Sequence, residues 1–449
     1  MNGRSRTTTS TAAASGITRV SVAPAPLRER AARGRDDGAA GRARKSGRSL
    51  VGYLLVPRPK DMVKALLMPA TFVLGVLAGG HLDGDTLVRA AVAWVALELL
   101  VYPARYQWND VRGFVADQAH PDERGRGRLP GPVARARAHV TASCTVALAR
   151  LAAVAALALL LPGLGGLLGA ITVGVFGIAV AYEALRAGTG RTGRVPPPLR
   201  PRLIALWVVV GAGYALRGMV GLVAAVGLGE RPVTLVAAAV ALWAFGIAFV
   251  TSRWALEALA FARIDDGRLV WTARAEQARE HLLGLVRWLP DRTTERDPAA
   301  WAALRSRTPV TAPWNLALVL AGTAAGLTGM LLTGAQPAPA AAAALLGGVA
   351  AAVAVFVPRG RVAVVLAGAV AQWGALVAEG APRPLAAVLP WFAVMAAYLV
   401  FSGQRLNTIG TSDERVRAAV VAVFAPVVHA VVGDATWGAL RTGGLRGSR

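Results

Sequence analysis

Charged residues are scarce in this sequence. Only 16% of the 449 residues are charged and 55% are hydrophobic, whereas a soluble protein carries about a quarter charged residues. The low charge excludes an ordinary soluble domain and indicates a protein that lies largely in a membrane.

Lysine is almost absent, occurring only at Lys45, Lys60 and Lys64, so arginine supplies nearly all of the positive charge behind the net +24. In a soluble protein such a basic excess suggests a nucleic-acid partner. In a membrane protein the positive-inside rule explains it, because cytoplasmic loops collect Lys and Arg. We therefore expect no nucleic acid among the partners.

Cysteine occurs once, at Cys144, which excludes an intrachain disulfide. The N-terminus lacks an apolar segment that could serve as a signal peptide. Residues 1–48 consist mainly of Ser, Thr, Ala, Gly and Arg. We expect them to form a disordered basic tail on the cytoplasmic side, touching anionic lipid at most.

Long apolar runs are what the sequence does have. A run of about 20 residues is needed to cross the hydrocarbon core. The sequence predicts an all-α, polytopic helical membrane bundle over residues 49–410, with about nine to ten transmembrane helices. The apolar runs lie near 62–80, 85–105, 138–161, 164–186, 203–228, 232–254, 313–334, 336–357, 360–379 and 383–402.

The connections between these runs alternate between short, Arg-poor turns and Arg-rich segments, which places the Arg-rich set and the N-terminus in the cytoplasm of a cell-membrane protein. Within one of these segments, residues 268–312 have the mixed charge of an amphipathic cytoplasmic element. Residues 411–449 read as an apolar or interfacial helix followed by a basic tail. The Arg-rich segments are 106–137, 187–202, 252–312, 358–361 and 403–415.

The stretch "WNDVRGFVADQAHPDERGRGRLPG", residues 108–131, begins where the second apolar run ends. Asn109, Asp110 and Asp117 place oxygen ligands at the membrane boundary, where charge is costly. Such ligands suit Mg²⁺, which usually shares them with the phosphates of a substrate. We therefore predict a metal site here.

Arginines follow the acids at Arg124, Arg126 and Arg128. Their forked donors suit phosphate oxygens, so acids and arginines together favour a diphosphate site. The alternative is a solvated loop whose arginines only set the topology. That alternative does not account for Asn109 and Asp110 lying directly against an apolar run.

The pattern "NDVRGFVAD…RGRLPG" resembles the first signature of the UbiA-type membrane prenyltransferases, N-D-x-x-D-x-x-x-D followed by an R-P-L-P-S-G-like segment. Three of its four polar positions are filled, and Gly113 stands where the middle aspartate belongs. The resemblance covers roughly residues 55 to 335, and this motif is its specific part.

Two further segments are similar to parts of the same family. "RPKDMVKALLMPATFVLG" resembles its first helix and would place Arg58 and Lys64 near the diphosphate. Tyr182 and Arg186 in "AYEALRAG" match a Y-x-x-x-K/R pattern and lie on one helical face. The alternative for all four residues is an ordinary interfacial tyrosine and snorkelling cations.

The family's second acidic motif should follow the sixth apolar run. The sequence there, "SRWALEALAFARIDDGR", offers Glu257, Asp265 and Asp266 at a shifted spacing. The resemblance makes them metal ligands together with Asn109, Asp110 and Asp117. The alternative is a charged helix end.

The resemblance implies an all-α bundle whose cavity opens to lipid and holds Mg²⁺ and an isoprenyl diphosphate, with catalysis assigned to Asp110 and Asp117. The prenyl group would pass to a lipophilic or aromatic acceptor, and Tyr106, Trp108 or Phe114 would face the allylic cation unless they only form an interfacial belt. A terpene cyclase and a non-catalytic membrane relative stay open as alternatives. A transporter is disfavoured, because the apolar runs are almost uncharged except at their ends.

Overall fold

The computed structural model describes residues 49–409 apart from 81, 119–127, 162, 191–193, 230, 273–274 and 276–277, together with 422, 425–426, 429–430 and 433–434. It describes only the backbone of residues 59–62, 116 and 337. The N-terminal tail, Arg124, Arg126 and almost all of the final apolar stretch lie outside the described residues.

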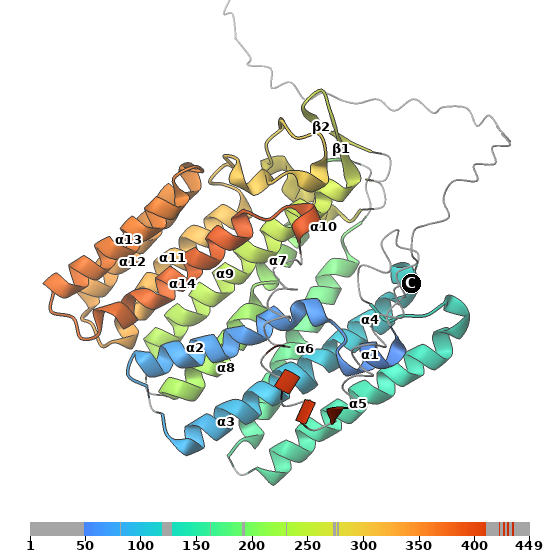
Figure 1. Ribbon diagram of the computed structural model, residues 1–449, viewed down its shortest axis with the longest axis horizontal. Helices are drawn as coiled ribbons and strands as arrows, with labels where there is room; N and C mark the ends of the chain where they lie inside the picture. Colours follow the sequence, from blue (N-terminus) through green and yellow to red (C-terminus); the bar gives the residue numbers. More distant parts are fainter. Residues whose placement is uncertain are drawn as a thin grey trace, which may run out of the picture. The chain divides into compact units, whose positions relative to one another are not determined.

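The apolar runs form helices, as the sequence predicts (Figure 1). Nine described helical segments are long and apolar enough to cross a membrane, and Val63–Leu77 is a shorter tenth. The chain is therefore a multi-pass helical membrane protein. The helices are α1 (Leu50–Leu55), η1 (Pro59–Leu66), α2 (Leu67–Leu77), α3 (Gly84–Val95), η2 (Ala96–Val101), α4 (Tyr102–Gln118), η3 (Val133–Arg135), α5 (Ala136–Leu160), α6 (Gly165–Ala187), α7 (Pro201–Val209), α8 (Ala212–Val226), α9 (Pro232–Ala258), α10 (Glu280–Leu283), α11 (Pro313–Leu332), α12 (Pro337–Phe356), α13 (Arg361–Ala378) and α14 (Pro384–Ser402).

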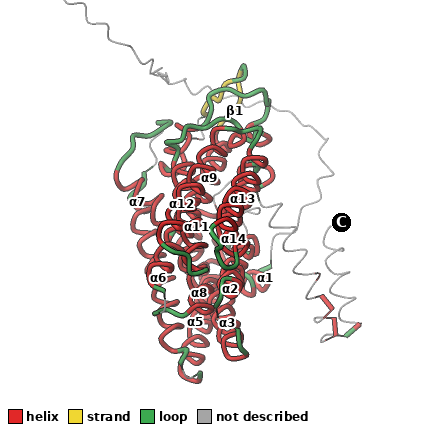
Figure 2. The backbone as a smooth tube through the Cα atoms, turned by 90° about the vertical axis from the view of Figure 1, so that its left-hand side faces the viewer, coloured by secondary structure: helices red, strands yellow, loops and turns green. Residues whose placement is uncertain are grey.

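Proline marks the start of five helices, namely α7, α9, α11, α12 and α14. Proline suits the first helical turn because its fixed φ matches the helix and the first amide groups lack helical partners. These residues therefore set where the spans begin. Figure 2 shows the long helices running side by side along one common direction.

Small residues allow close helix packing. A Cβ added at Gly221 of α8 would collide with the backbone carbonyl of Met68 on α2, and one at Gly329 of α11 would collide with that of Ala387 on α14. In a membrane, small residues at a helix interface bring backbones close enough for dispersion contacts, which replace the hydrophobic effect as the driving force.

One long span, Gly84–Val115, joins α3, α4 and the π-helical turn η2 between them. Glu98 lies in this turn and is buried against Arg217 of α8, with Nε to Oε1 at 2.7 Å. Glu98 and Arg217 are exceptions to the pattern that the apolar runs are almost uncharged except at their ends. A buried pair of opposite charges avoids the cost of an isolated ion in this environment.

The segment between α9 and α11 contains β1 (Ala262–Asp265) and β2 (Arg268–Trp271), which pair as an antiparallel hairpin. It also contains α10 and short 3₁₀ turns, one before the hairpin and the others after α10. The turns are η4 (Leu259–Phe261), η6 (Gly284–Trp288), η7 (Pro298–Ala300) and η8 (Ala303–Arg305), and a last one, η9 (Leu406–Thr408), follows α14. Buried side chains of this segment, including Leu283, Leu285 and Trp301, pack against the end of α9 at Ala255 and Leu256. The segment therefore covers one end of the bundle, where the hairpin is visible in Figure 2.

Candidate functional site at the ends of α4 and α6

The site begins with Asn109 and Asp110, near the end of the span Gly84–Val115. Asp110 is fully buried and Asn109 is nearly so. A buried carboxylate must be paired and hydrogen-bonded to compensate for its lost hydration. The hydrogen-bond partners of Asp110 therefore define the chemistry of this end of the bundle.

Both oxygens of Asp110 accept bonds from side chains outside α4. Arg58 Nη2 donates to Oδ1 at 2.5 Å, and Arg128 Nη1 donates to the same oxygen at 2.8 Å. Tyr53 donates its hydroxyl to Oδ2 at 3.3 Å. Asp110 thus connects α4 to Tyr53 and Arg58, which precede it by more than 50 positions, and to Arg128, which follows it by 18.

The short helix α1 positions Tyr53. Ser49 caps its first turn by accepting from the Gly52 amide at 3.1 Å. Tyr53 is fully buried beside Phe114 and Leu129. Burial first, and then the nearby Asp110 carboxylate, raises the pKa of Tyr53, so its hydroxyl stays protonated and serves as a donor.

The other end of α1 is held by a neighbouring helix. Arg150 of α5 donates to the carbonyls of Leu54 at 2.6 Å and Leu55 at 2.9 Å, and also to the side chain of Gln107. The last carbonyls of a helix lack internal partners. This arginine therefore fixes the direction in which the chain leaves α1 toward Arg58.

Asn109 links the α4 side of the site to α6. With its amide oriented to satisfy both neighbours, Nδ2 donates to Glu183 Oε1 at 2.8 Å and Oδ1 accepts from Arg58 Nη2 at 2.6 Å. Glu183 is buried and pairs through Oε2 with Arg186 Nη2 at 3.1 Å. The Arg186 guanidinium lies 5.8 Å from the centre of the Tyr182 ring, so the two residues share a helical face, as their spacing predicts.

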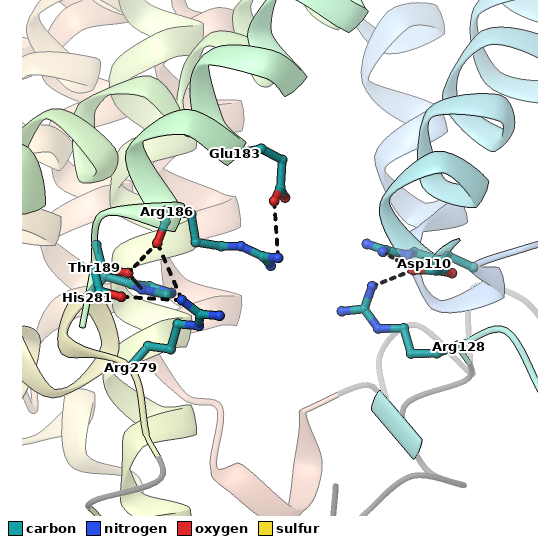
Figure 3. A network of polar contacts seen from close by, with 8 residues as sticks. Asp110, Arg128, Glu183, Arg186, Thr189, Arg279 and His281 are labelled. Carbon is teal, nitrogen blue, oxygen red and sulfur yellow. Dashed lines mark hydrogen bonds and ion pairs between the residues drawn. The ribbon is translucent and has the colours of Figure 1, made fainter. Parts of the chain in front are cut away.

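These contacts form one continuous chain of polar groups. Figure 3 shows its two terminal arginines, Arg128 and Arg186, pointing toward one another from opposite sides of the site. Its two acids are Asp110, which lies beside Arg128, and Glu183, which lies beside Arg186. In order, the chain runs Arg128, Asp110, Arg58, Asn109, Glu183 and Arg186.

The backbone that follows Arg186 is held by residues just before and within α10. Arg279 donates to the Thr189 carbonyl at 3.3 Å (Figure 3). Glu280 accepts from the Gly190 amide at 3.1 Å. His281 lies 3.3 Å from the Thr189 hydroxyl, and burial, with Arg186 and Arg279 nearby, lowers its pKa to about 3. Described residues of the Arg-rich connections after α4, α6 and α9 thus lie at one end of the bundle.

Asp117 lies near the end of α4, half-buried, with its carboxylate turned back along the helix. A Cβ added at Gly113 would lie 3.1 Å from Asp117 Oδ2. The space beside the absent middle aspartate is therefore partly taken by the carboxylate of Asp117. Lys64 lies on η1, also half-buried.

The second group of predicted acids is dispersed. Asp265 ends strand β1 and Asp266 lies in the hairpin turn; both are exposed, and Asp265 pairs with Arg263 at 3.0 Å. Asp266 has φ +47°, which an Asp-Gly hairpin turn requires at its first position. Glu257 lies in the last turn of α9. The strand pairing and the turn account for the positions of Asp265 and Asp266, and no metal is needed to explain them.

Among the described residues, no group of three or more His, Cys, Asp or Glu side chains is placed to hold a metal ion. Both oxygens of Asp110 and both of Glu183 already accept bonds from Arg, Tyr or Asn. The residues in this arrangement do not fit the Mg²⁺ that the resemblance implies. They fit an anion better, because several guanidinium groups converge here.

The aromatic residues predicted beside the allylic cation already pack against protein groups. The Arg58 guanidinium lies 4.6 Å from the centre of the Tyr106 ring, and that of Arg112 lies 5.2 Å from the Trp108 ring. Phe114 is buried in the cluster with Tyr53. These contacts favour structural roles for the three rings.

Sequence reasoning missed Glu183 and Tyr53. Glu183 had a signal, since it is an acid within an otherwise apolar run, where ionisable residues are rare and usually functional. Tyr53 had none, because its contact with Asp110 spans 57 positions of the chain.

A comparison of the chain with protein-family models, with curated proteins and with solved structures finds no match in any of the three.

Proposed function

We propose that this protein is an integral membrane prenyltransferase, which cleaves an isoprenyl diphosphate and transfers the prenyl group to a lipophilic or aromatic acceptor. The observation that carries the proposal is the polar chain from Arg128 to Arg186 at one end of an apolar bundle. It unites residues of the motif that resembles the UbiA-type signature with Arg58 and Arg186, which the same resemblance assigns to the diphosphate.

The bundle also offers space for an apolar chain. A cavity of about 170 Å³ lies between α2, α8, α9, α11 and α14, and apolar side chains form most of its wall. The wall includes Leu67, nine positions after Arg58 in the chain. A substrate with an anionic head and a hydrocarbon tail suits a protein that presents arginines at one end and apolar surface within.

The reaction breaks the bond between the allylic carbon and the diphosphate oxygen, and the electron pair stays on that oxygen. Arg58, Arg128 and Arg186 stabilise the charge that grows on the leaving group. The apolar surroundings exclude water, so an electron-rich acceptor captures the allylic cation and then loses a proton. If the prenyl chain's own double bond captures the cation, the product is a terpene.

We place the site and the N-terminus on the cytoplasmic side, because the Arg-rich connections gather there. Mg²⁺ is the cofactor that the resemblance implies, so the assay has arms with and without it. The other partners we propose are membrane lipid and the acceptor.

The test is release of pyrophosphate from a C20 allylic diphosphate by the purified full-length chain in lipid nanodiscs. We expect release that depends on a phenolic acceptor, whereas release with a hydrocarbon or terpene alcohol product identifies the cyclase. Asp110→Ala should slow release, because the side chain that positions Arg58 and Arg128 before the substrate binds is lost, and Asp117→Ala should reduce it. No release by the wild-type chain in any arm would leave a non-catalytic relative as the better description.

A further inference from the structure

Two guanidinium groups point toward one another at the candidate site. Arg128 approaches from the loop before α5 and Arg186 from the end of α6 (Figure 3). Each ion pair engages one terminal nitrogen of a guanidinium that has five N–H donors. Facing cations repel each other, so this arrangement suits an anion held between them.

The carboxylates of the site are oriented toward arginines. Asp110 Oδ1 accepts from Arg58 and Arg128, and Glu183 Oε2 accepts from Arg186. A Mg²⁺ ligand must bring its oxygen to about 2.0–2.1 Å from the metal. Asp110 Oδ1 already accepts from two arginines, so it could bind a metal only if one of them withdrew. The two acids therefore act as counter-ions to the arginines.

The position of the absent aspartate agrees with this assignment. Gly113 supplies no carboxylate, and the Asp117 carboxylate turns back toward it. The predicted second acidic group lies partly in the exposed hairpin turn. Within the described residues, the arginines at this site are better placed for a ligand than the acids.

We propose that Arg58, Arg128 and Arg186 bind the diphosphate directly and that no metal is needed for this binding. The phosphate oxygens take the places that Asp110 and Glu183 occupy in the structure, because charge-assisted forks from arginine fit phosphate as well as carboxylate. The inference rests on the proposed function and specifies how the same site recognises its substrate.

The experiment measures binding rather than turnover. A radiolabelled C20 isoprenyl diphosphate is titrated onto the full-length chain in nanodiscs, once with EDTA and once with Mg²⁺. We expect affinities that agree within about threefold, since no metal contributes. Arg128→Gln and Arg186→Gln should each weaken binding about tenfold or more in both buffers, because each removes a charged hydrogen-bond donor.

Arg89→Gln is the matched control. Arg89 pairs with Asp85 at 2.6 Å, near the opposite end of the span Gly84–Val115 from Asp110. Its side chain is 48% exposed. It should leave the affinity unchanged. Equal losses in all three variants would show that only general positive charge matters and would overturn the proposal.

The acids provide the sharper test. Asp110→Asn and Glu183→Gln keep the shape of the side chain but remove the competing charge, so we expect the affinity in EDTA to stay equal or to rise. Thermal unfolding of each variant identifies a folding failure, and two separate acids are tested so that one unstable variant does not decide the result. A tenfold loss in both well-folded variants would overturn the proposal.

The outcomes separate the two levels of inference. Binding only in Mg²⁺ overturns direct recognition by arginine and leaves the prenyltransferase proposal standing. Absence of binding in both buffers overturns both.

Discussion

The span Gly84–Val115 carries two polar clusters of different character. In the first, Glu98 and Arg217 form a closed pair in which both side chains are only 4% exposed. In the second, Asp110 pairs with arginines whose side chains are 15% and 22% exposed. One helix thus presents a dry pair midway along its length and an accessible, arginine-rich cluster near its end.

The aromatic surroundings sharpen the contrast. The Arg217 guanidinium lies 3.4 Å from the centre of the Tyr102 ring and donates to the Tyr106 hydroxyl at 3.2 Å. Its charge is therefore met by one acid and two tyrosines. The end cluster has three arginines around Asp110 and Glu183, and two of those arginines face each other. The first cluster has the composition of a structural element and the second that of an anion site.

The largest expected effect comes from breaking the closed pair. Arg217→Met leaves Glu98 buried without its partner, which should lower the free energy of unfolding by about 3–5 kcal/mol. Denaturation of the chain in detergent micelles measures the change. The double variant Glu98→Leu/Arg217→Met should recover most of the loss, because it removes both charges. A single variant as stable as the wild type would contradict the structural role.

The next effect concerns the loop that supports Arg186. His281 has a pKa of about 3, below its ordinary value near 6.5. The unfolded chain therefore binds a proton between these values and the folded chain does not, so stability falls as the pH drops through this window and is constant above it. We expect a loss of at most about 2 kcal/mol between pH 7 and pH 5. His281→Gln should flatten the unfolding profile over that interval, and an unchanged slope would exclude His281 as its source.

A smaller effect is expected when Tyr53 is changed, which tests its role at Asp110 apart from that of the arginines. Tyr53→Phe removes a hydroxyl donor 3.3 Å from Asp110 and leaves both arginine contacts in place. We expect a loss of about 1 kcal/mol in unfolding free energy, the net contribution of one hydrogen bond. Affinity for the C20 diphosphate should stay within about twofold. A large loss of affinity would show that Tyr53 orients the site.

The smallest effect is expected in the hairpin. Asp265→Asn removes an ion pair whose side chains are 57% and 62% exposed. Such a pair contributes less than about 1 kcal/mol, because water and salt screen it. Neither this variant nor Asp266→Asn should change diphosphate affinity, with or without Mg²⁺. If either variant lost Mg²⁺-dependent binding of the diphosphate, the prediction that these aspartates bind a metal would be supported instead.

The hairpin also shows where sequence reasoning went astray. "ARIDDGRLVW" has an Asp-Gly pair between an alternating run and a run rich in β-branched and aromatic residues, which is a local signal for a hairpin. The resemblance assigns the same two aspartates to an acidic motif, whereas the turn itself accounts for their positions. The local signal was sufficient here and was outweighed by an expectation about function.

The sequence by itself determined the helical membrane class, the approximate spans and the starts of several helices, because apolar length and proline act locally. It also identified Asn109 and Asp110 as unusual, since charge beside an apolar run is costly. Only the tertiary structure showed that Asp110 is held by Tyr53, Arg58 and Arg128, and that Asn109 reaches Glu183. Such contacts depend on how helices pack, and packing brings together side chains whose separation along the chain carries no information about their distance in space.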